Sequence, residues 1–166
     1  SDITASGSDI ITISSPGVKV RADLTSGGVS AETLDSTFSR KSLRADGSAV
    51  VAWPYQPRSN AGSEFYFSTD YGRTFEKHYL SEGTNSPISQ AFASQHRAIL
   101  ISGNQVVLYD NNTRTISYYE RDNIPFSAIY TANENSIIYA FADVLAGHVK
   151  VQSIDRVSGR VTLLSQ

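Results

Sequence analysis

The strongest indication of the fold is the stretch STDYGRTF, residues Ser68 to Phe75. It lies between two runs rich in residues that favour β-strands, Glu64–Phe67 and Phe75–Leu80. Gly72 can adopt the positive φ that a tight chain reversal needs. The Asp70 carboxylate can accept hydrogen bonds from backbone N–H groups of its own turn. These residue types therefore predict a β-hairpin whose turn is held by its own side chains.

This stretch resembles the Asp-box, S-x-D-x-G-x-T-W, which recurs in the blades of sialidase-type and sortilin-like β-propellers. The positions that carry the resemblance are Ser68, Asp70, Gly72, Thr74 and Phe75, with Phe75 where Trp is usual. The resemblance implies a structural hairpin clasp, in which Ser68 and Thr74 hold the flanks and Phe75 turns inward as an anchor. In that family the motif usually lies far from the catalytic centre, so it implies an architecture rather than an activity.

Length and composition narrow the class of protein. The chain has 166 residues, 40% of them hydrophobic and 18% charged, which fits one domain or at most two small ones. Its net charge of −2 gives no strong field to attract nucleic acid or a membrane surface, so we expect neither as a partner. Cysteine is absent, which excludes disulfides and Cys-ligated metal sites. No signal peptide opens the sequence, so we expect synthesis in the cytoplasm.

The residue pattern indicates an all-β chain of antiparallel meanders. Short bursts of Tyr, Phe, Val and Ile alternate with Gly, Asn, Asp, Ser and Pro, which favour turns. The strands predicted from residue 48 onward are Ala49–Pro54, Glu64–Ser68, Thr74–Leu80, Arg97–Ser102, Gln105–Tyr109, Thr115–Glu120, Ser127–Thr131, Ser136–Phe141, His148–Ile154 and Arg160–Leu164. The short links between them predict tight, local hairpins.

Three apolar runs suggest a repeat, namely Ala49–Trp53, Ala98–Ser102 and Ser136–Ala140. They recur at separations of roughly 40 to 50 residues, the blade period of propellers. Their nearly continuous apolar character is typical of strands buried on both faces. We therefore expect about three propeller-blade-like units over residues 48–166, with a β-sandwich as the alternative. Three blades cannot close a propeller, so other copies of the chain or another protein are the expected partners.

The first 47 residues are expected to form a less regular N-terminal segment. Strands are predicted at Asp9–Ser14 and Val18–Leu24. Apolar residues within Ala31–Phe38, behind a possible N-cap at Ser30, predict one short helix. Two interpretations remain open: an arm that docks on a neighbouring subunit, or a first layer of the same domain.

Candidate site residues fall into two groups besides the hairpin. The first is the loop after an apolar strand, with Trp53, Tyr55 and Arg58, residue types that are frequent in protein interfaces and in sugar stacking. The second is the pair Tyr118 and Tyr119, whose side chains should point to opposite faces of a strand.

No catalytic residue, metal ligand or cofactor site is predicted. Asp70 is expected to cap its turn. Glycosidase chemistry needs two carboxyl groups, and none of the arginines sits in a motif that would identify it with the arginine cluster of sialidases. His78, His96 and His148 lack metal-binding spacing, and no phosphate-binding loop is present.

The function that this pattern favours is a non-enzymatic structural, assembly or adaptor protein acting through protein–protein contacts. By analogy with other small all-β proteins, a phage virion is the expected setting, as a head-decoration, neck or tail component. The alternatives are a lectin-like module that binds a glycan through aromatic loops, and a sialidase-type glycosidase propeller completed by oligomerisation.

Overall fold

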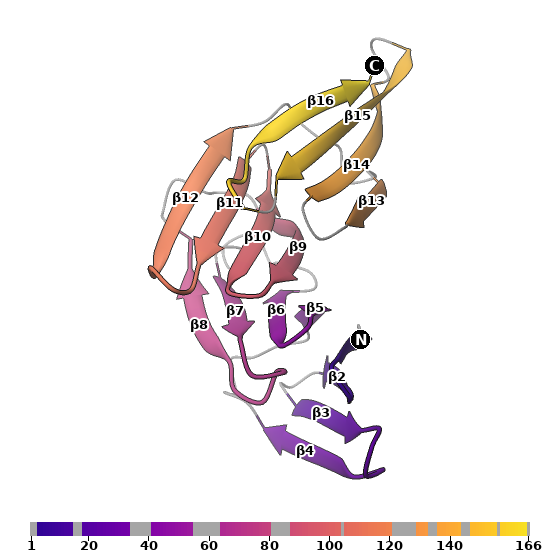
Figure 1. Cartoon of the computed structure of the whole chain (residues 1–166), viewed down its shortest axis with the longest axis vertical. Helices are drawn as coiled ribbons and strands as arrows, with labels where there is room; N and C mark the ends of the chain where they lie inside the picture. The colour runs from indigo at the N-terminus through magenta and orange to yellow at the C-terminus, as the bar shows by residue number, and fades with distance from the viewer. Residues whose placement is uncertain are drawn as a thin grey trace.

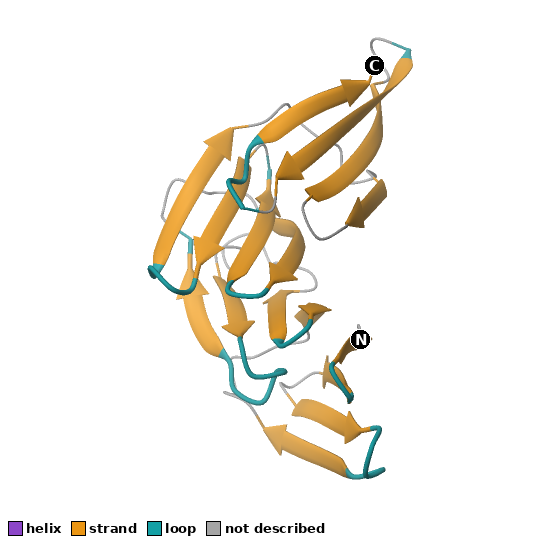
Figure 2. Ribbon diagram, viewed as in Figure 1, coloured by secondary structure: helices purple, strands orange, loops and turns teal. Residues whose placement is uncertain are grey.

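The computed structural model shows sixteen β-strands among the residues it describes, arranged as four antiparallel sheets of four strands each. It describes residues 3–14, 18–33, 41–54, 64–80, 87–103, 105–120, 129–132, 136–143, 147–155 and 157–165. Strands and loops account for all of these residues (Figure 2). In this part of the chain no helix is long and apolar enough to cross a membrane.

Each sheet is a meander whose strands lie side by side in chain order. The first sheet contains β1 (Ile3–Ser6), β2 (Asp9–Ser14), β3 (Val18–Asp23) and β4 (Val29–Thr33). The second contains β5 (Lys41–Asp46), β6 (Ala49–Pro54), β7 (Glu64–Ser68) and β8 (Glu76–Tyr79). The third contains β9 (Ile88–Ser94), β10 (Arg97–Ser102), β11 (Gln105–Asp110) and β12 (Thr115–Glu120). The fourth contains β13 (Ile129–Ala132), β14 (Ser136–Asp143), β15 (His148–Asp155) and β16 (Val161–Ser165).

Short turns hold the hairpins in register. Asp46 pairs with Ala49 across β5 and β6, so two residues make the turn between them. The first of the two, Gly47, has a φ of 57°, a left-handed conformation that two-residue hairpin turns require. The turn chemistry visible in the sequence therefore accounts for the local, antiparallel order of the strands.

The four sheets follow one another along a curve (Figure 1). Strands β8, β12 and β16 lie along its convex side, and β5, β9 and β13 lie along its concave side. The first and fourth sheets are at opposite ends of the curve, so each has a described neighbouring sheet on one side.

Three apolar clusters join the sheets in series. The first and second sheets share Ile11, Ile13, Leu43, Val50, Ala52 and Tyr66. The second and third sheets share Ala49, Val51, Trp53, Phe65, Phe67, Leu80, Ile88, Ala91, Ala93, Ala98, Leu100, Val107 and Tyr109. The third and fourth sheets share Phe92, Ile99, Ile101, Val106, Leu108, Ile137, Tyr139 and Ile154. Neighbouring residues of one strand thus belong to different clusters, because alternate side chains point to opposite faces of a sheet.

The all-β, blade-like fold class is confirmed, with four sheets in place of the about three expected. The additional sheet comes from residues 3–33, within the segment expected to be less regular. The end of that segment, β5, belongs to the second sheet. The short helix expected from Ala31 is wrong as far as Thr33, because Val29–Thr33 forms β4 and pairs with β3. The rest of that expected helix, residues 34–38, lies outside the described residues.

Candidate functional site

The Asp70 carboxylate is held by its own loop between β7 and β8. Thr74 donates its backbone N–H to Asp70 Oδ1 at 2.9 Å and its hydroxyl to Oδ2 at 2.6 Å. Ser68 donates its hydroxyl to Oδ1 at 2.7 Å and accepts the backbone N–H of Gly72 at 3.0 Å. Partial burial acts to raise the pKa of Asp70, but the hydrogen bonds from Thr74 and Ser68 outweigh it and hold that pKa below its usual value. Both carboxylate oxygens are therefore engaged in the turn.

The same loop also contacts the first sheet. Gly72 has a φ of 71°, and a Cβ at this position would lie 2.5 Å from Cδ1 of Ile11 on β2. Lys19 of β3 donates its Nζ to the backbone carbonyl of Arg73, and this Nζ lies 5.9 Å from the ring centroid of Phe75. Phe75 is partly buried against the cluster between the first two sheets. The loop of residues 68–75 thus has contacts that stabilise the junction of two sheets.

The aromatic candidates do not converge on one surface. Trp53 is 4% exposed and belongs to the core between the second and third sheets. Tyr119 packs against the core between the third and fourth sheets, while Tyr118 beside it is 37% exposed. Tyr55 and Arg58 lie outside the described residues. The structure therefore places Trp53 and Tyr119 in two different cores.

Titratable groups do not form a metal site in the part of the chain that the structure describes, where no group of three or more His, Cys, Asp or Glu side chains comes together. His78 is half-buried between aromatic rings, with centroid distances of 4.3 Å to Tyr109 and 5.1 Å to Phe65. Burial lowers the pKa of His78, so the neutral imidazole is favoured there. Its surroundings are those of a core side chain.

The outer face of the first sheet is apolar. On β2, Ile11 and Ile13 point toward the second sheet and are fully buried. Strand register places these side chains on the opposite face, together with Thr12 and Thr33: Ala5, Ile10, Val18, Val20, Ala22, Val29 and Ala31. Val29 is 72% exposed, and the described apolar clusters include none of this set. The charged side chains Asp9, Lys19 and Arg21 point the other way, toward the second sheet.

The outer face of the fourth sheet has the same character. Ile137 and Tyr139 of β14 point toward the third sheet and are fully buried. Strand register places on the opposite face Ile138, Ala140, Ala142, Val149 and Val151. Val149 is 56% exposed, and the apolar clusters of the described residues include none of the five.

The second strands of the two inner sheets, β6 and β10, are covered on both faces. Every residue of β6 is buried, and so is every residue of β10 after Arg97. The sequence of β14 is apolar in the same continuous way from Ile137 to Ala142, whereas Asp9, Thr12 and Ser14 interrupt the isoleucines of β2. In both strands buried and partly exposed residues alternate. A continuous apolar pattern is typical of a strand covered on both faces. The sequence shows that pattern at Ser136–Ala140 and does not show it in β2, so the outer face of the first sheet is a finding of the structure.

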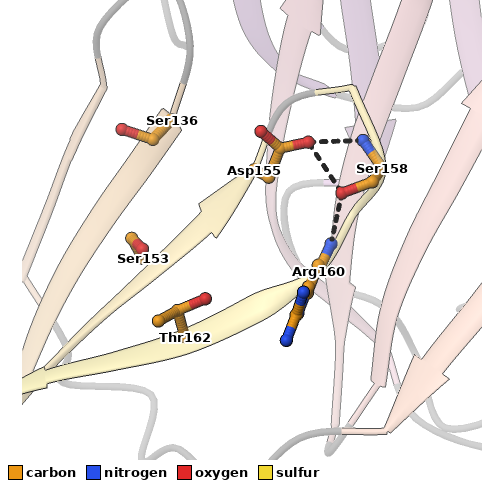
Figure 3. Close-up of a pocket in the computed structure, with 6 residues that line it drawn as sticks. All are labelled: Ser136, Ser153, Asp155, Ser158, Arg160 and Thr162. Carbon is orange, nitrogen blue, oxygen red and sulfur yellow. Dashed lines mark hydrogen bonds between the residues drawn. The ribbon is translucent and has the colours of Figure 1, made fainter.

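A polar depression of about 460 Å³ lies at one end of the fourth sheet's outer face (Figure 3). Its lining residues are Ser136, Ser153, Asp155, Ser158, Arg160 and Thr162. Hydrogen bonds from Ser158, through its hydroxyl at 2.7 Å and its N–H at 2.6 Å to Asp155 Oδ1, lower the pKa of Asp155. The carboxylate is thus engaged in the turn between β15 and β16, and the hydroxyl groups form a polar margin beside the apolar side chains.

Comparison with known proteins supports the fold. No family model and no curated protein matches the chain. Among solved structures it is similar to BamB from Moraxella catarrhalis, with a TM-score of 0.61, 15% identity, and coverage of 97% of this chain and 47% of that one. It is also similar to the Cps50 (Swd1) β-propeller domain of Myceliophteria thermophila, with a TM-score of 0.61, 13% identity, and coverage of 99% and 55%. A third similar structure is the computationally designed Ika4 protein, with a TM-score of 0.61, 16% identity, and coverage of 90% and 88%.

These likenesses define the class of architecture: stacked sheets of the β-propeller type. The chain spans about half the length of the first two of these structures. At such low identity the likeness shows the fold alone.

Proposed function

We propose that this chain is a non-enzymatic assembly or adaptor module that acts through protein–protein contacts made by its two outer sheet faces. The observation that carries the proposal is the contrast between β2 and β14 and their counterparts β6 and β10. β14 has the same continuous apolar sequence as β6 and β10, and β2 carries isoleucines on both of its faces, but the described residues cover only one face of β2 and β14.

Two apolar sheet faces that the described residues leave partly exposed favour a protein partner. Monomeric proteins rarely expose large contiguous apolar patches, and such patches mark interaction sites. On the outer face of the fourth sheet, apolar residues lie beside a polar depression that Asp155 and Arg160 help to line. On the outer face of the first sheet, strand register places no charged residue of β2 or β3, and Thr12 lies beside Val20. An apolar centre and a polar rim are the usual anatomy of a protein interface.

The carboxylate that would first be suspected of catalysis supports the same proposal. Both oxygens of Asp70 accept hydrogen bonds from Ser68 and Thr74. Hydrogen bonds of this kind favour a structural role for Asp70 in its turn, which agrees with the proposal.

The proposal is tested by placing a charge at the centre of each outer face. Tagged chains carrying Val20→Glu or Val151→Glu are recovered under native conditions, together with the protein bound to them, and compared with the wild type. Asn112→Glu adds the same charge on an exposed hairpin of the third sheet and serves as the control. We expect the wild type and the control to hold a stoichiometric protein complex, made of further copies or of another protein, and the two face variants to lose it.

Glycan-array binding and turnover of a fluorogenic sialoside test the lectin and glycosidase alternatives. Either activity, unchanged in the face variants, would overturn the proposal. So would a protein complex that both face variants retain. The expected setting in a virion stays a prediction of the sequence, for which mass spectrometry of purified particles is the test.

A further inference from the structure

We infer that the outer face of the first sheet packs on the outer face of the fourth sheet of a second copy, so that two copies close one ring of eight sheets. This inference rests on the proposed function and names the partner of its two faces.

The order of the existing junctions sets the orientation. The second sheet turns Val50 and Ala52 toward the first sheet, and Val51 and Trp53 toward the third. We call the face that a sheet turns toward the earlier sheet of the chain its preceding face, and the face toward the later sheet its following face. Every internal junction joins the following face of one sheet to the preceding face of the next. The first sheet lacks a neighbour on its preceding face, and the fourth sheet lacks one on its following face, within the described residues. A first-to-fourth contact repeats the internal arrangement, whereas a first-to-first contact does not.

The composition of the outer faces matches that of a buried junction. Between the second and third sheets, alanines lie among larger aliphatic side chains such as Val51 and Leu100. The outer face of the first sheet likewise combines Ile10 and Val20 with alanines. That of the fourth sheet combines Ile138 with alanines and valines. Small residues beside branched ones let two sheets approach closely and interdigitate. Each face is therefore suited to another sheet of the same kind.

The shape of the chain sets the number of copies. The four sheets follow a curve, and the two uncovered faces lie at its ends (Figure 1). A head-to-tail contact closes into a ring when successive rotations complete a turn, and otherwise gives an open filament. Propellers typically contain about four to eight blades, so two copies reach the upper limit and three exceed it. Two of the similar solved chains, BamB and the Cps50 propeller domain, are about twice as long as this one, as two joined copies would be, whereas the designed Ika4 protein is about as long as this chain.

A two-copy ring also accounts for the polar depression on the fourth sheet. The residues Ser136, Ser153 and Thr162 place hydroxyl groups on three adjacent strands (Figure 3), and the strand register pairs Ser153 with Ile138. In the ring these groups lie at the rim of each junction, where hydrogen bonds and bridging water are usual. The closed ring has two identical junctions. Together they must bury the interface area of at least about 1,000 Å² that a specific complex needs.

A charge-exchange experiment tests the inference. Val20→Glu alters the first sheet's face and Val151→Lys the fourth sheet's face, and both side chains are partly exposed in the single chain. Each variant alone should be a monomer by native mass spectrometry, and the Asn112→Glu control should remain a dimer. An equimolar mixture of the two variants should give a mixed dimer, because it holds one Glu–Lys junction and one unaltered junction. The milder Val20→Thr and Val151→Thr should each weaken the dimer about tenfold or more.

Three results would overturn the inference: a wild-type monomer at every concentration, an open filament, or a dimer that only one of the two face variants disrupts. A dimer lost in Val20→Glu but retained in Val151→Lys would indicate contact between two first sheets. A monomer whose faces are required to bind a different protein would overturn the two-copy ring and leave the proposed function standing. Circular dichroism of each variant establishes that loss of the dimer occurs in a folded chain.

Discussion

At the scale of single residues, the loop of residues 68–75 has two structural roles: it stabilises its own turn, and it contacts the first sheet. Asp70 and Ser68 close the loop on itself through their hydrogen bonds. Gly72 lets the loop approach the first sheet, because Ile11 fills the space beside its Cα. The residue types indicated the first of these roles. The second depends on a contact between residues far apart in the sequence, so no local pattern could predict it.

Replacing Asp70 by Ala should lower the free energy of unfolding by about 1–3 kcal/mol near pH 7, because turn donors lose their acceptor. The pKa of Asp70 is lowered in the folded state. Its stabilising contribution is therefore present above the unfolded pKa of about 3.9, and is lost as pH falls through the folded pKa. Denaturant unfolding of wild type and variant at several pH values should show the difference shrinking below about pH 4. A difference that stays constant down to pH 2 would contradict a role for the charged form.

Replacing Gly72 by Ala should destabilise the protein more than the same change at Gly47. Both glycines have positive φ, 71° and 57°, so both variants carry the strain of a left-handed Ala, about 1–2 kcal/mol. Only at Gly72 does the added methyl group also meet Ile11, while nothing lies within 4 Å of a Cβ at Gly47. Melting temperatures of the two variants measure the contrast. Equal decreases in melting temperature would show that the contact between Gly72 and Ile11 does not stabilise the protein.

At the scale of elements, the strands that the sequence identified best are the ones covered on both faces. The predicted strands Ala49–Pro54 and Arg97–Ser102 coincide with β6 and β10, because a buried strand must be apolar at almost every position. Three strands that begin a sheet, β1, β5 and β9, have no counterpart among the predicted strands, although Leu43 of β5 is 3% exposed. Such strands gain their backbone partners from the neighbouring strand, so their own composition specifies them weakly.

The β7–β8 loop connects two elements through Phe75, and its aromatic ring should be replaceable by a larger one. Phe75→Ala should cost about 1–2 kcal/mol, less than a fully buried Phe, because the ring is only partly buried. Phe75→Trp should cost less, since it keeps an aromatic face for Lys19, whose Nζ lies 5.9 Å from the ring centroid. Thermal unfolding of both variants gives the comparison. Equal, small losses would place Phe75 outside the junction between the first two sheets.

At the scale of the whole molecule, the described residues leave one face of the first sheet and one face of the fourth sheet without a neighbouring sheet. The sequence predicted incomplete closure and a partner from the number of blade-like units. It could not show which faces would be left open, because that depends on how the first 33 residues fold. Once β2 is seen to carry Ile11 on one face and Ile10 on the other, the unfinished junction is visible in the structure.

The native mass of the wild-type chain, measured by sedimentation equilibrium over a wide concentration range, tests this account most directly. The account predicts a single species of twice the 18.0 kDa chain mass, with no larger species forming as the concentration rises, because a two-copy ring leaves no outer sheet face uncovered. A monodisperse 18.0 kDa monomer at the highest concentration would contradict it.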